Sequence, residues 1–309
     1  MALAEKYHLP LTDLNFSQAR FTRQLIEQDD PAHLQQVVQL SSTLVLPVAQ
    51  GRAPLNGSGL ELVPSADYPL PDGGEFIYLG QGGGHDYVAA MLPAAPQDGG
   101  RGAEWIDLRT AFTSVPVEEQ HLMLIAQAIV NWRQSCRFCP RCGSALRSTT
   151  GGWVLRCVDN DHELFPRTDP AVIVAIVDDA DRLLLGANSR WTNRVYSVLA
   201  GFVEAGESLE SAVRREVFEE SGVRVGDCAY RGSQPWPLPR SLMLGYTAHA
   251  QTTDLVPDGL EILDLRWFSR EELGQELRAG SIQIPRGVSI AHALIRDWYG
   301  QELPEAADL

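Results

Sequence analysis

Residues 201–223 read GFVEAGESLESAVRREVFEESGV, and this stretch decides how the whole chain is interpreted. Gly201 opens a glycine-containing loop, and Ser208 is a residue type that commonly caps a helix N-terminus. The residues after Ser208 are helix formers without an internal Gly or Pro, until Gly222 supplies a stop signal. The stretch therefore predicts a loop followed by a helix over Leu209–Ser221.

The predicted helix carries a cluster of carboxylates. Glu216, Glu219 and Glu220 stand at spacing i, i+3 and i+4, so they share one helix face and repel one another unless a cation lies between them. A solvated acidic face is the alternative, but the same stripe is apolar in the first turns of the helix. We therefore expect a face that begins in the core and ends at the rim of a cleft. Its oxygen-only ligand set suits Mg²⁺ or Mn²⁺.

Length and charge restrict the class of protein. With 309 residues the chain is long enough for two or three domains. The net charge of −15 disfavours long, nonspecific nucleic-acid binding, because a polyanion is repelled at long range. No apolar run approaches the ~20 residues that span a bilayer, and the N-terminus lacks the layout of a signal peptide. We expect a soluble, cytoplasmic protein that does not enter a membrane.

The cysteines are clustered rather than spread along the chain. Of the 5 cysteines, all but Cys228 lie between Cys136 and Cys157. This favours a metal site over a disulfide framework and fits a reducing compartment. Cys139 and Cys142 are two residues apart, as on a zinc knuckle that presents two thiolates to one ion.

A structural zinc ribbon is the predicted metal site. The predicted ligands are Cys139, Cys142, Cys157 and His162. A second Cys-x₂-Cys pair would need a cysteine at position 160, which is Asn160. Cys136 offers a competing Cys₄ solution, but a strand-paired ribbon draws its fourth ligand more naturally from beyond Cys157. A closed four-ligand shell leaves no open position for substrate, so this zinc is expected to stabilise and not to catalyse.

The hydrophobic pattern predicts an α/β protein with three parts. Short apolar runs separated by Gly/Pro-rich loops predict an N-terminal α+β domain over residues 1–131, closed by a helix near Val117–Trp132. The zinc ribbon is placed at residues 132–168. The apolar runs Ala171–Val177 and Leu183–Leu185, with helices over Leu209–Ser221 and Ser289–Tyr299, predict an α/β/α sandwich with a mixed sheet over residues 169–309.

Written as a pattern, the opening stretch matches the Nudix box at every defining position. A zinc ribbon precedes it, and the motif Ser233-Gln-Pro-Trp-Pro-Leu-Pro-Arg-Ser241 follows it. This order resembles the bacterial NADH pyrophosphatase branch of the Nudix hydrolases, strongly over about Trp132 to Trp298 and weakly before that. The branch usually has Phe where this chain has Leu238, which keeps the position apolar but removes one ring.

The resemblance implies a function and a site. Similar proteins hydrolyse NADH and NAD⁺ to AMP and the nicotinamide mononucleotide, and some remove NAD caps from RNA 5′ ends. They work as homodimers with sites completed across the interface. Carried over by matched motif, the catalytic and metal-binding carboxylates are Glu216, Glu219 and Glu220, joined at the metal by Glu261. The implied substrate contacts are Phe202 and Phe165 flanking the base and Ser241, Met243 and Ala291 lining the nucleotide pocket.

Three alternatives remain open at this level. Another Nudix enzyme could act on ADP-ribose, FAD, a dinucleoside polyphosphate or a capped RNA, because the box specifies the cleaved linkage and not its substituents. A sensor could bind a nucleotide without cleaving it, although all box glutamates are present. Finally, arginines near the ribbon could bind nucleic acid. These arginines are Arg133, Arg137, Arg141, Arg147 and Arg156.

Overall fold

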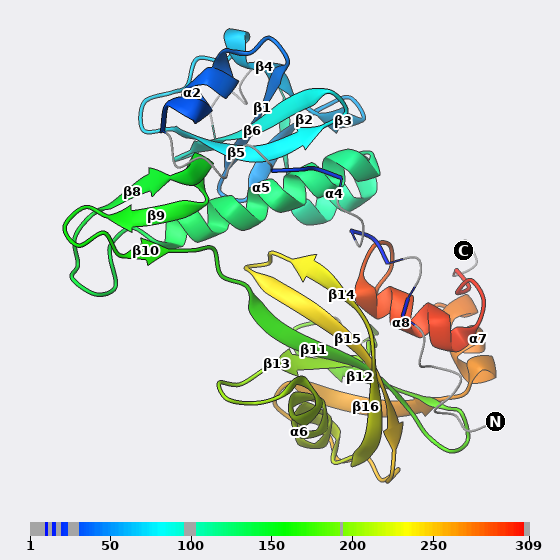
Figure 1. Ribbon diagram of the computed structural model, residues 1–309. Coiled ribbons are helices and arrows are strands. Elements are labelled where there is room, and N and C mark those ends of the chain that lie inside the picture. Colours follow the sequence, from blue (N-terminus) through cyan, green and yellow to red (C-terminus); the bar gives the residue numbers. More distant parts are fainter. Residues whose placement is uncertain are drawn as a thin grey trace. The chain divides into compact units, whose positions relative to one another are not determined.

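The computed structural model describes residues 10–11, 14–16, 20–23, 31–95, 103–191 and 194–305, and the chain divides into two units (Figure 1). The first unit comprises Met1–Ser17, Asp169–Pro235 and Ser241–Leu309. The second unit comprises Gln18–Thr168 and Trp236–Arg240. In the described part of the chain, no helix combines the length and the apolar character needed to cross a membrane.

The first unit is built on a 6-stranded mixed sheet with the strand order β14-β15-β11-β12-β16, to which β13 adds by pairing with β11. Its strands are β11 (Asp169–Val177), β12 (Leu183–Asn188), β13 (Leu199–Phe202), β14 (Val225–Trp236), β15 (Ser241–Ala250) and β16 (Ile262–Phe268). Strands β11 and β15 run parallel, whereas β12 and β13 pair with β11 in the antiparallel sense. The predicted mixed sheet is therefore confirmed.

Helices cover both faces of this sheet (Figure 1). They are α6 (Leu209–Ser221), α7 (Arg270–Arg278) and α8 (Ile290–Tyr299). Successive side chains of β11 point to opposite faces, as strand geometry requires. Val172 and Val174 pack in one core cluster with residues of α6, while Ile173 and Ala175 pack in another with residues of α7 and α8. The predicted α/β/α sandwich is confirmed.

The helix boundaries follow the signals in the sequence. The Ser208 hydroxyl accepts a hydrogen bond from the Ser211 N–H at 3.2 Å and so caps α6. Gly222 ends α6 in the left-handed conformation with φ of 71°, which a residue without a Cβ adopts without strain. Ser289 caps α8 in the same way as Ser208 caps α6.

The second unit contains a 7-stranded sheet and the ribbon. The sheet strands are β1 (Thr43–Ala49), β2 (Arg52–Asn56), β3 (Gly59–Leu60), β4 (Val63–Pro64), β5 (Glu75–Gly82), β6 (His85–Leu92) and β7 (Glu104–Asp107), and the helices are α2 (Pro31–Gln39), α4 (Leu108–Ser114) and α5 (Val117–Ser135). The order is β3-β2-β1-β6-β5, with β4 on β1 and β7 on β2. Val37 of α2 packs in a core cluster with side chains of β1, β5 and β6.

The ribbon has 3 strands, β8 (Leu146–Thr149), β9 (Val154–Cys157) and β10 (Glu163–Leu164), with the short helix η3 (Thr150–Gly152) between β8 and β9. It is attached to β5. The Trp153 indole N–H donates to the Tyr78 carbonyl at 2.6 Å, and a Cβ on Gly152 would lie 2.8 Å from Ile77 Cγ2. Glycine at 152 thus permits the close approach of the ribbon to β5.

Two short segments belong to units that their sequence position does not indicate. Leu11 and Leu14, which we expected in the N-terminal domain, pack on the first unit: Leu14 joins its core, and the Leu11 N–H donates to the Arg231 carbonyl at 2.7 Å. Residues 236–240 belong to the second unit, where the Asn131 amide donates to the carbonyls of Pro237 and Pro239 at 3.0 and 2.9 Å. Each attachment joins a residue to a backbone carbonyl far away in the sequence, and no local pattern marks such a contact.

Candidate active site

The Glu216 carboxylate packs directly against Gly201. Gly201 lies on β13, and a Cβ built on it would stand 2.0 Å from Glu216 Cδ and 2.2 and 2.3 Å from the two carboxylate oxygens. The Glu216 carboxylate therefore occupies the space that any other side chain at position 201 would need. This contact explains why a glycine precedes the glutamate helix by so fixed a spacing.

Arg215 ties several carboxylates together. Its guanidinium donates to Glu207 at 2.8 and 2.9 Å, to Glu216 at 2.9 Å and to Glu219 at 3.0 Å. It also donates to the Phe202 carbonyl at 2.9 Å. The bond from Arg215 lowers the pKa of Glu207, and the same bond raises the pKa of Arg215 above its ordinary value. Arg215 thus holds the helix face and the β13 loop in one arrangement.

Glu220 is the buried member of the cluster. It is 6% exposed, and its Oε2 atom has no hydrogen-bond partner among the described residues. Burial first, then the nearby charges of Glu216, Glu261 and Asp258, raise the pKa of Glu220 to about 8. A buried oxygen without a partner beside other carboxylates is costly unless a cation completes it. The all-oxygen donor set and this unpartnered oxygen are of the kind that Mg²⁺ or Mn²⁺ binds. Among the described residues, however, no three of these carboxylates bring ligand atoms within 4.8 Å of one another, as the ribbon cysteines do.

The helix face is less uniform than its spacing indicates. Glu220 continues the buried stripe of Ala212, Val213 and Val217, each of which is fully buried. The Glu216 side chain is 15% exposed, whereas that of Glu219 is 57% exposed and leans on Arg215. The expectation of a face that passes from core to rim holds for Glu216 and Glu220, while Glu219 lies on the solvent side.

Glu261 directly precedes β16. Its Oε1 accepts a hydrogen bond from the Asn188 amide at 3.3 Å, and its carbonyl accepts from the Ser189 N–H at 2.8 Å. Its charge acts on Glu220, so the two carboxylates belong to the same region. Asn188 and Asp258 were not predicted from the sequence. The Asp258-Gly259 pair, a common turn dipeptide, was the one available signal for the Asp258 turn.

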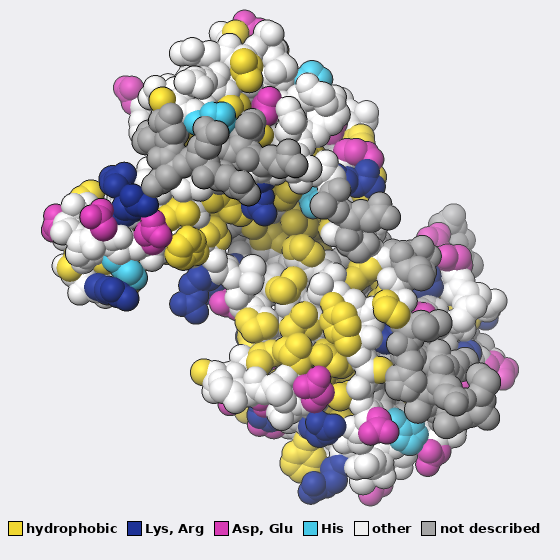
Figure 2. Space-filling model, in the orientation of Figure 1, with side chains coloured by type: hydrophobic (Ala, Val, Ile, Leu, Met, Phe, Trp, Pro, Cys, Tyr) yellow, Lys and Arg dark blue, Asp and Glu magenta, His cyan; other side chains and the backbone are white. Residues whose placement is uncertain are grey.

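Phe202, a predicted base contact, and Met243, a predicted pocket residue, lie on the opposite face of the sheet from Glu216. In the strand register, Ala171 of β11 pairs with both Phe202 of β13 and Met243 of β15, so the three share one face. Gly201, one residue before Phe202, pairs with Val172 and faces α6. Phe202 is 56% exposed, and apolar side chains gather over this part of the first unit in Figure 2. A single step along β13 thus leads from the carboxylate side to an apolar surface.

The remaining predicted contacts are divided between the units. Ser241 at the start of β15 and Ala291 of α8 are both buried, and Ala291 belongs to the core cluster against which Met243 packs. Gln234, fully buried, donates to the Val288 carbonyl at 2.6 Å and accepts from the Ile290 N–H at 2.8 Å, which fixes the start of α8 beside Ala291. Phe165 lies in the second unit, just after β10, and is 59% exposed.

In the ribbon, three of the predicted zinc ligands converge. The Sγ atoms of Cys139, Cys142 and Cys157 all lie within 4.8 Å of one another, and those of Cys142 and Cys157 are 3.4 Å apart. Tetrahedral zinc with Zn–S bonds of about 2.3 Å needs sulfurs roughly 3.8 Å apart, which this spacing fits. Hydrogen bonds, first from Ser144, lower the pKa of the Cys142 thiol to about 7, which favours the thiolate that zinc needs.

The fourth zinc ligand has two candidates in different places. His162 Nδ1 lies 3.7 Å from Cys139 Sγ, whereas Cys136 contacts the Ser135 hydroxyl and is not among the clustered thiols. Asn160, at the position where a second Cys-x₂-Cys pair would have a cysteine, donates from its amide to Cys142 Sγ at 3.1 Å. Neither residue belongs to the group of three thiols within 4.8 Å of one another, but the 3.7 Å approach to Cys139 Sγ favours His162 over Cys136 as the residue that completes a Cys₃His set.

For zinc, we expect Cys139→Ser and Cys157→Ser to abolish metal retention and to lower the melting temperature together, because a closed structural site contributes binding energy to folding. Metal analysis of freshly purified protein should find one zinc per chain in the wild type. Cys228→Ser, in the first unit, is the matched control and should keep its zinc. A wild-type protein without zinc would contradict the assignment.

The raised pKa of Glu220 predicts a pH-dependent stability of the protein without Mg²⁺ or Mn²⁺. Its folded pKa of about 8 exceeds the ordinary value of 4.5, so the folded state binds more protons than the unfolded state between these values. The free energy of unfolding should therefore fall as pH rises from 4.5 to 8. Glu220→Gln removes this loss, so the variant should be more stable than wild type at pH 8 and similar at pH 4.5 in urea titrations. If Glu220→Gln were less stable than wild type at pH 8, the raised pKa of Glu220 would be refuted.

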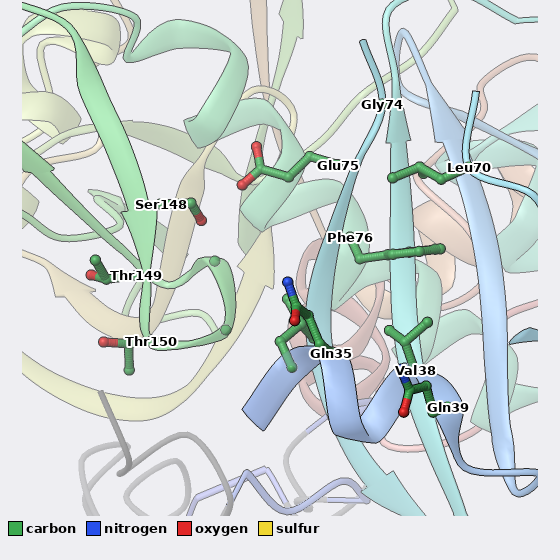
Figure 3. A pocket seen from close by; sticks show the side chains of 13 residues that line it. Gln35, Val38, Gln39, Leu70, Gly74, Glu75, Phe76, Ser148, Thr149 and Thr150 are labelled. Atoms are coloured by element: carbon green, nitrogen blue, oxygen red, sulfur yellow. The ribbon is translucent and has the colours of Figure 1, made fainter. Parts of the chain in front are cut away.

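A separate hollow of about 460 Å³ lies in the second unit between α2, β5 and the ribbon (Figure 3). The Phe76 ring lies between Leu70 and Val38, and Glu75 points toward the β8 side. Glu75 is the one charged side chain among the described residues that line the hollow, and it is ion-paired with Arg133. The hollow contains none of the predicted site residues.

Comparisons with known proteins agree with this fold and with the order of its parts. The NUDIX domain model matches residues 167–286, the NADH pyrophosphatase-like rudimentary NUDIX domain model residues 19–132, and the NADH pyrophosphatase zinc ribbon domain model residues 134–165. A NAD-capped RNA hydrolase NudC from Mycobacterium tuberculosis is 40% identical over 265 residues, which cover 81% of this chain and 82% of that protein.

Two further proteins show how far the similarity extends. A NAD-capped RNA hydrolase NUDT12 from Homo sapiens is 40% identical over 196 residues, or 59% of this chain and 42% of that protein. The crystal structure of a NUDIX hydrolase from Nitrosomonas europaea is 22% identical with a TM-score of 0.39, covering 55% of this chain and 96% of that one.

The sandwich fold and the carboxylate cluster on α6 are those of a metal-dependent hydrolase of phosphoric anhydrides. This chain belongs to the NUDIX hydrolase family, in the branch that combines an NADH pyrophosphatase-like rudimentary domain and a zinc ribbon with the NUDIX domain. Family membership implies the use of a divalent metal ion. The resemblance drawn from the sequence is thereby confirmed.

Proposed function

We propose that this protein hydrolyses the pyrophosphate linkage of NADH and NAD⁺ to AMP and the nicotinamide mononucleotide, and that it removes NAD caps from RNA 5′ ends. The observation that carries the proposal is the carboxylate cluster of α6: Glu216 packs against Gly201, and the buried Oε2 atom of Glu220 has no hydrogen-bond partner in the described part of the chain. The relatives named as NAD-capped RNA hydrolases support the choice of substrate.

The proposed metal ligands are Glu216, Glu219, Glu220 and Glu261. When bound there, Mg²⁺ or Mn²⁺ supplies neutralisation of the pyrophosphate charge, polarisation of a phosphoryl oxygen and a lowered pKa for a coordinated water. Arg215 keeps Glu216 in place through its hydrogen bond and anchors the β13 loop through the Phe202 carbonyl. Arg215 and Glu216 therefore hold the metal-binding face of α6 in place before the metal ion binds.

The chain's own residues also orient the substrate. The nucleotide base is proposed to stack on Phe202, which shares one face of the sheet with Met243 on the other side of Ala171. Ser241 and Ala291 are proposed to line the rest of the pocket. We propose that the phosphates bind on the carboxylate side of the Gly201–Phe202 step and that the base binds on the other face, because successive residues of a strand point to opposite faces.

The reaction needs no covalent intermediate on the protein. A water oxygen bonds to one phosphorus while the bridging oxygen leaves with the other phosphate, which gives two monophosphates. A glutamate carboxylate of the cluster is proposed to accept a hydrogen bond from the attacking water and so to orient it.

In the ribbon, we propose a structural zinc held by Cys139, Cys142, Cys157 and His162. We also propose that the protein acts as a homodimer. The dimer proposal rests on the family resemblance and is tested by the molar mass in solution.

Product analysis tests the proposed activity. The protein is incubated with Mg²⁺ or Mn²⁺ and, separately, with NADH, NAD⁺, ADP-ribose, FAD and diadenosine tetraphosphate, and the nucleotides are separated by chromatography. We expect AMP and the reduced mononucleotide from NADH, with a higher kcat/KM than for the other substrates. Cleavage of ADP-ribose or a dinucleoside polyphosphate with NADH intact would replace the proposal by another NUDIX activity. Binding without cleavage would indicate a sensor.

A nucleic-acid-binding ribbon is the less favoured alternative. Arg133 pairs with Glu75 and Arg156 pairs with Glu163, so two of the five arginines near the ribbon are committed to carboxylates. Figure 2 shows Asp and Glu side chains among the Lys and Arg side chains of the ribbon. On the face that Figure 2 shows, the two signs of charge are mixed and do not form the continuous basic patch that nonspecific nucleic-acid binding requires.

A further inference from the structure

The backbone around Glu261 is fixed from two sides. The Asp258 Oδ1 atom accepts hydrogen bonds from the N–H groups of Leu260, Glu261 and Ile262 at 3.0, 3.1 and 2.8 Å. On the other side, the Glu261 carbonyl accepts from the Ser189 N–H at 2.8 Å. A single carboxylate that gathers three successive N–H groups forms a tight turn, so Glu261 enters β16 with a defined direction.

The side chain of Glu261 is held as well. The Asn188 Nδ2 atom donates to Glu261 Oε1 at 3.3 Å, while Asn188 Oδ1 accepts from the Arg190 N–H at 2.9 Å. The second bond sets the orientation of the amide, because only the oxygen end can accept from an N–H. Asn188 ends β12 at an irregularity in its pairing with β16. Such irregularities re-aim side chains beside functional sites.

We propose that Asn188 and Asp258 are positioning residues that fix the direction of the Glu261 carboxylate and thereby tighten the binding of the divalent metal ion. This inference rests on the proposed function for the role of Glu261 as a metal ligand. Asn188 and Asp258 act through Glu261, Asn188 on its carboxylate and Asp258 on its backbone. Outer partners of this kind are commonly worth about 10- to 100-fold in metal affinity.

A turn that only stabilised the fold would behave differently. Loss of Asp258 would then lower the melting temperature without changing metal affinity beyond what the lost stability explains. The readout is therefore the dissociation constant for Mn²⁺, measured by electron paramagnetic resonance of the free ion on the full-length protein without any nucleotide. The melting temperature of each variant is recorded beside it.

We expect Asn188→Ala and Asp258→Ala each to weaken Mn²⁺ binding about tenfold. Asp254→Ala, which changes an exposed aspartate of the same loop, is the matched control and should leave binding unchanged. Asp258→Asn keeps an oxygen that accepts the three backbone N–H bonds, so it should bind Mn²⁺ more tightly than Asp258→Ala and guards against a variant that fails to fold. Equal, wild-type affinity in Asn188→Ala and Asp258→Ala would overturn the proposal.

A double substitution shows whether Asn188 acts through Glu261. In a Glu261→Gln background, Asn188→Ala should cost little further affinity, because neighbouring groups that act as one unit are not additive. A full additional tenfold loss would overturn the inference. The Mn²⁺ binding assay contains no nucleotide, so it is independent of the NADH cleavage assay. If NADH were not cleaved but Mn²⁺ binding still depended on Asn188, the proposed substrate would be rejected and this inference would stand.

Discussion

Glu220→Gln is expected to lower the turnover of NADH by more than about 100-fold, since even outer partners of a metal site are worth roughly 10- to 100-fold and this residue is proposed to bind the metal directly. The substitution keeps the size of the side chain but removes the charge from a buried oxygen that has no partner among the described residues. It should leave the fold intact. The measurement is kcat for NADH at saturating Mn²⁺.

The control for this prediction lies on the same helix. Glu210→Gln changes an exposed glutamate in the first turn of α6 and should leave kcat unchanged. Glu219→Gln should also depress turnover, and it additionally removes a partner of Arg215. Turnover near the wild-type value in both Glu219→Gln and Glu220→Gln would rule out the assigned site.

The second large effect is expected from a single methyl group. Gly201→Ala places a Cβ where the Glu216 carboxylate lies, 2.0 Å from its carbon, so one of the two must move. The displaced carboxylate also loses its bond with Arg215. We expect kcat to fall by about 100-fold or more, as for the loss of a metal ligand, with a folded protein by circular dichroism.

A matched glycine separates this effect from general strain. A Cβ on Gly226 of β14 would meet the Gln251 amide at 2.8 Å, which is the end of a long, adjustable side chain. Gly226→Ala should therefore keep nearly full turnover. If Gly201→Ala retained a kcat within about threefold of wild type, the close packing of Glu216 against Gly201 would have no catalytic role.

The sequence predicted the parts of this protein that depend on local spacing. Helix α6 begins after Ser208 and ends at Gly222 because a cap and a left-handed glycine are local signals. The alternation of β11 between two cores likewise follows from the continuous apolar run Ala171–Val177. The family, the mixed sheet and the sandwich were all predicted on these grounds.

The parts that the sequence did not predict depend on contacts between distant residues. Asn188 and Glu261 meet only because β12 and β16 pair, and no local pattern marks that bond. The packing of Glu216 against Gly201 was also not predicted, because the Nudix box pattern gives the spacing of the two residues but not the contact between them. Helix phase alone placed Glu219 with its neighbours, whereas the bond to Arg215 keeps it on the solvent side.

The most direct test of the central claim is the fate of solvent oxygen. The protein is incubated with NADH and Mn²⁺ in water enriched in ¹⁸O, with Glu220→Gln run in parallel. AMP and the reduced nicotinamide mononucleotide are then separated, and the ¹⁸O content of each is measured by mass spectrometry. We predict one ¹⁸O atom in one of the two products for the wild-type protein and almost no product for the variant. Unlabelled products, or equal product from Glu220→Gln, would contradict water attack at the carboxylate cluster of α6.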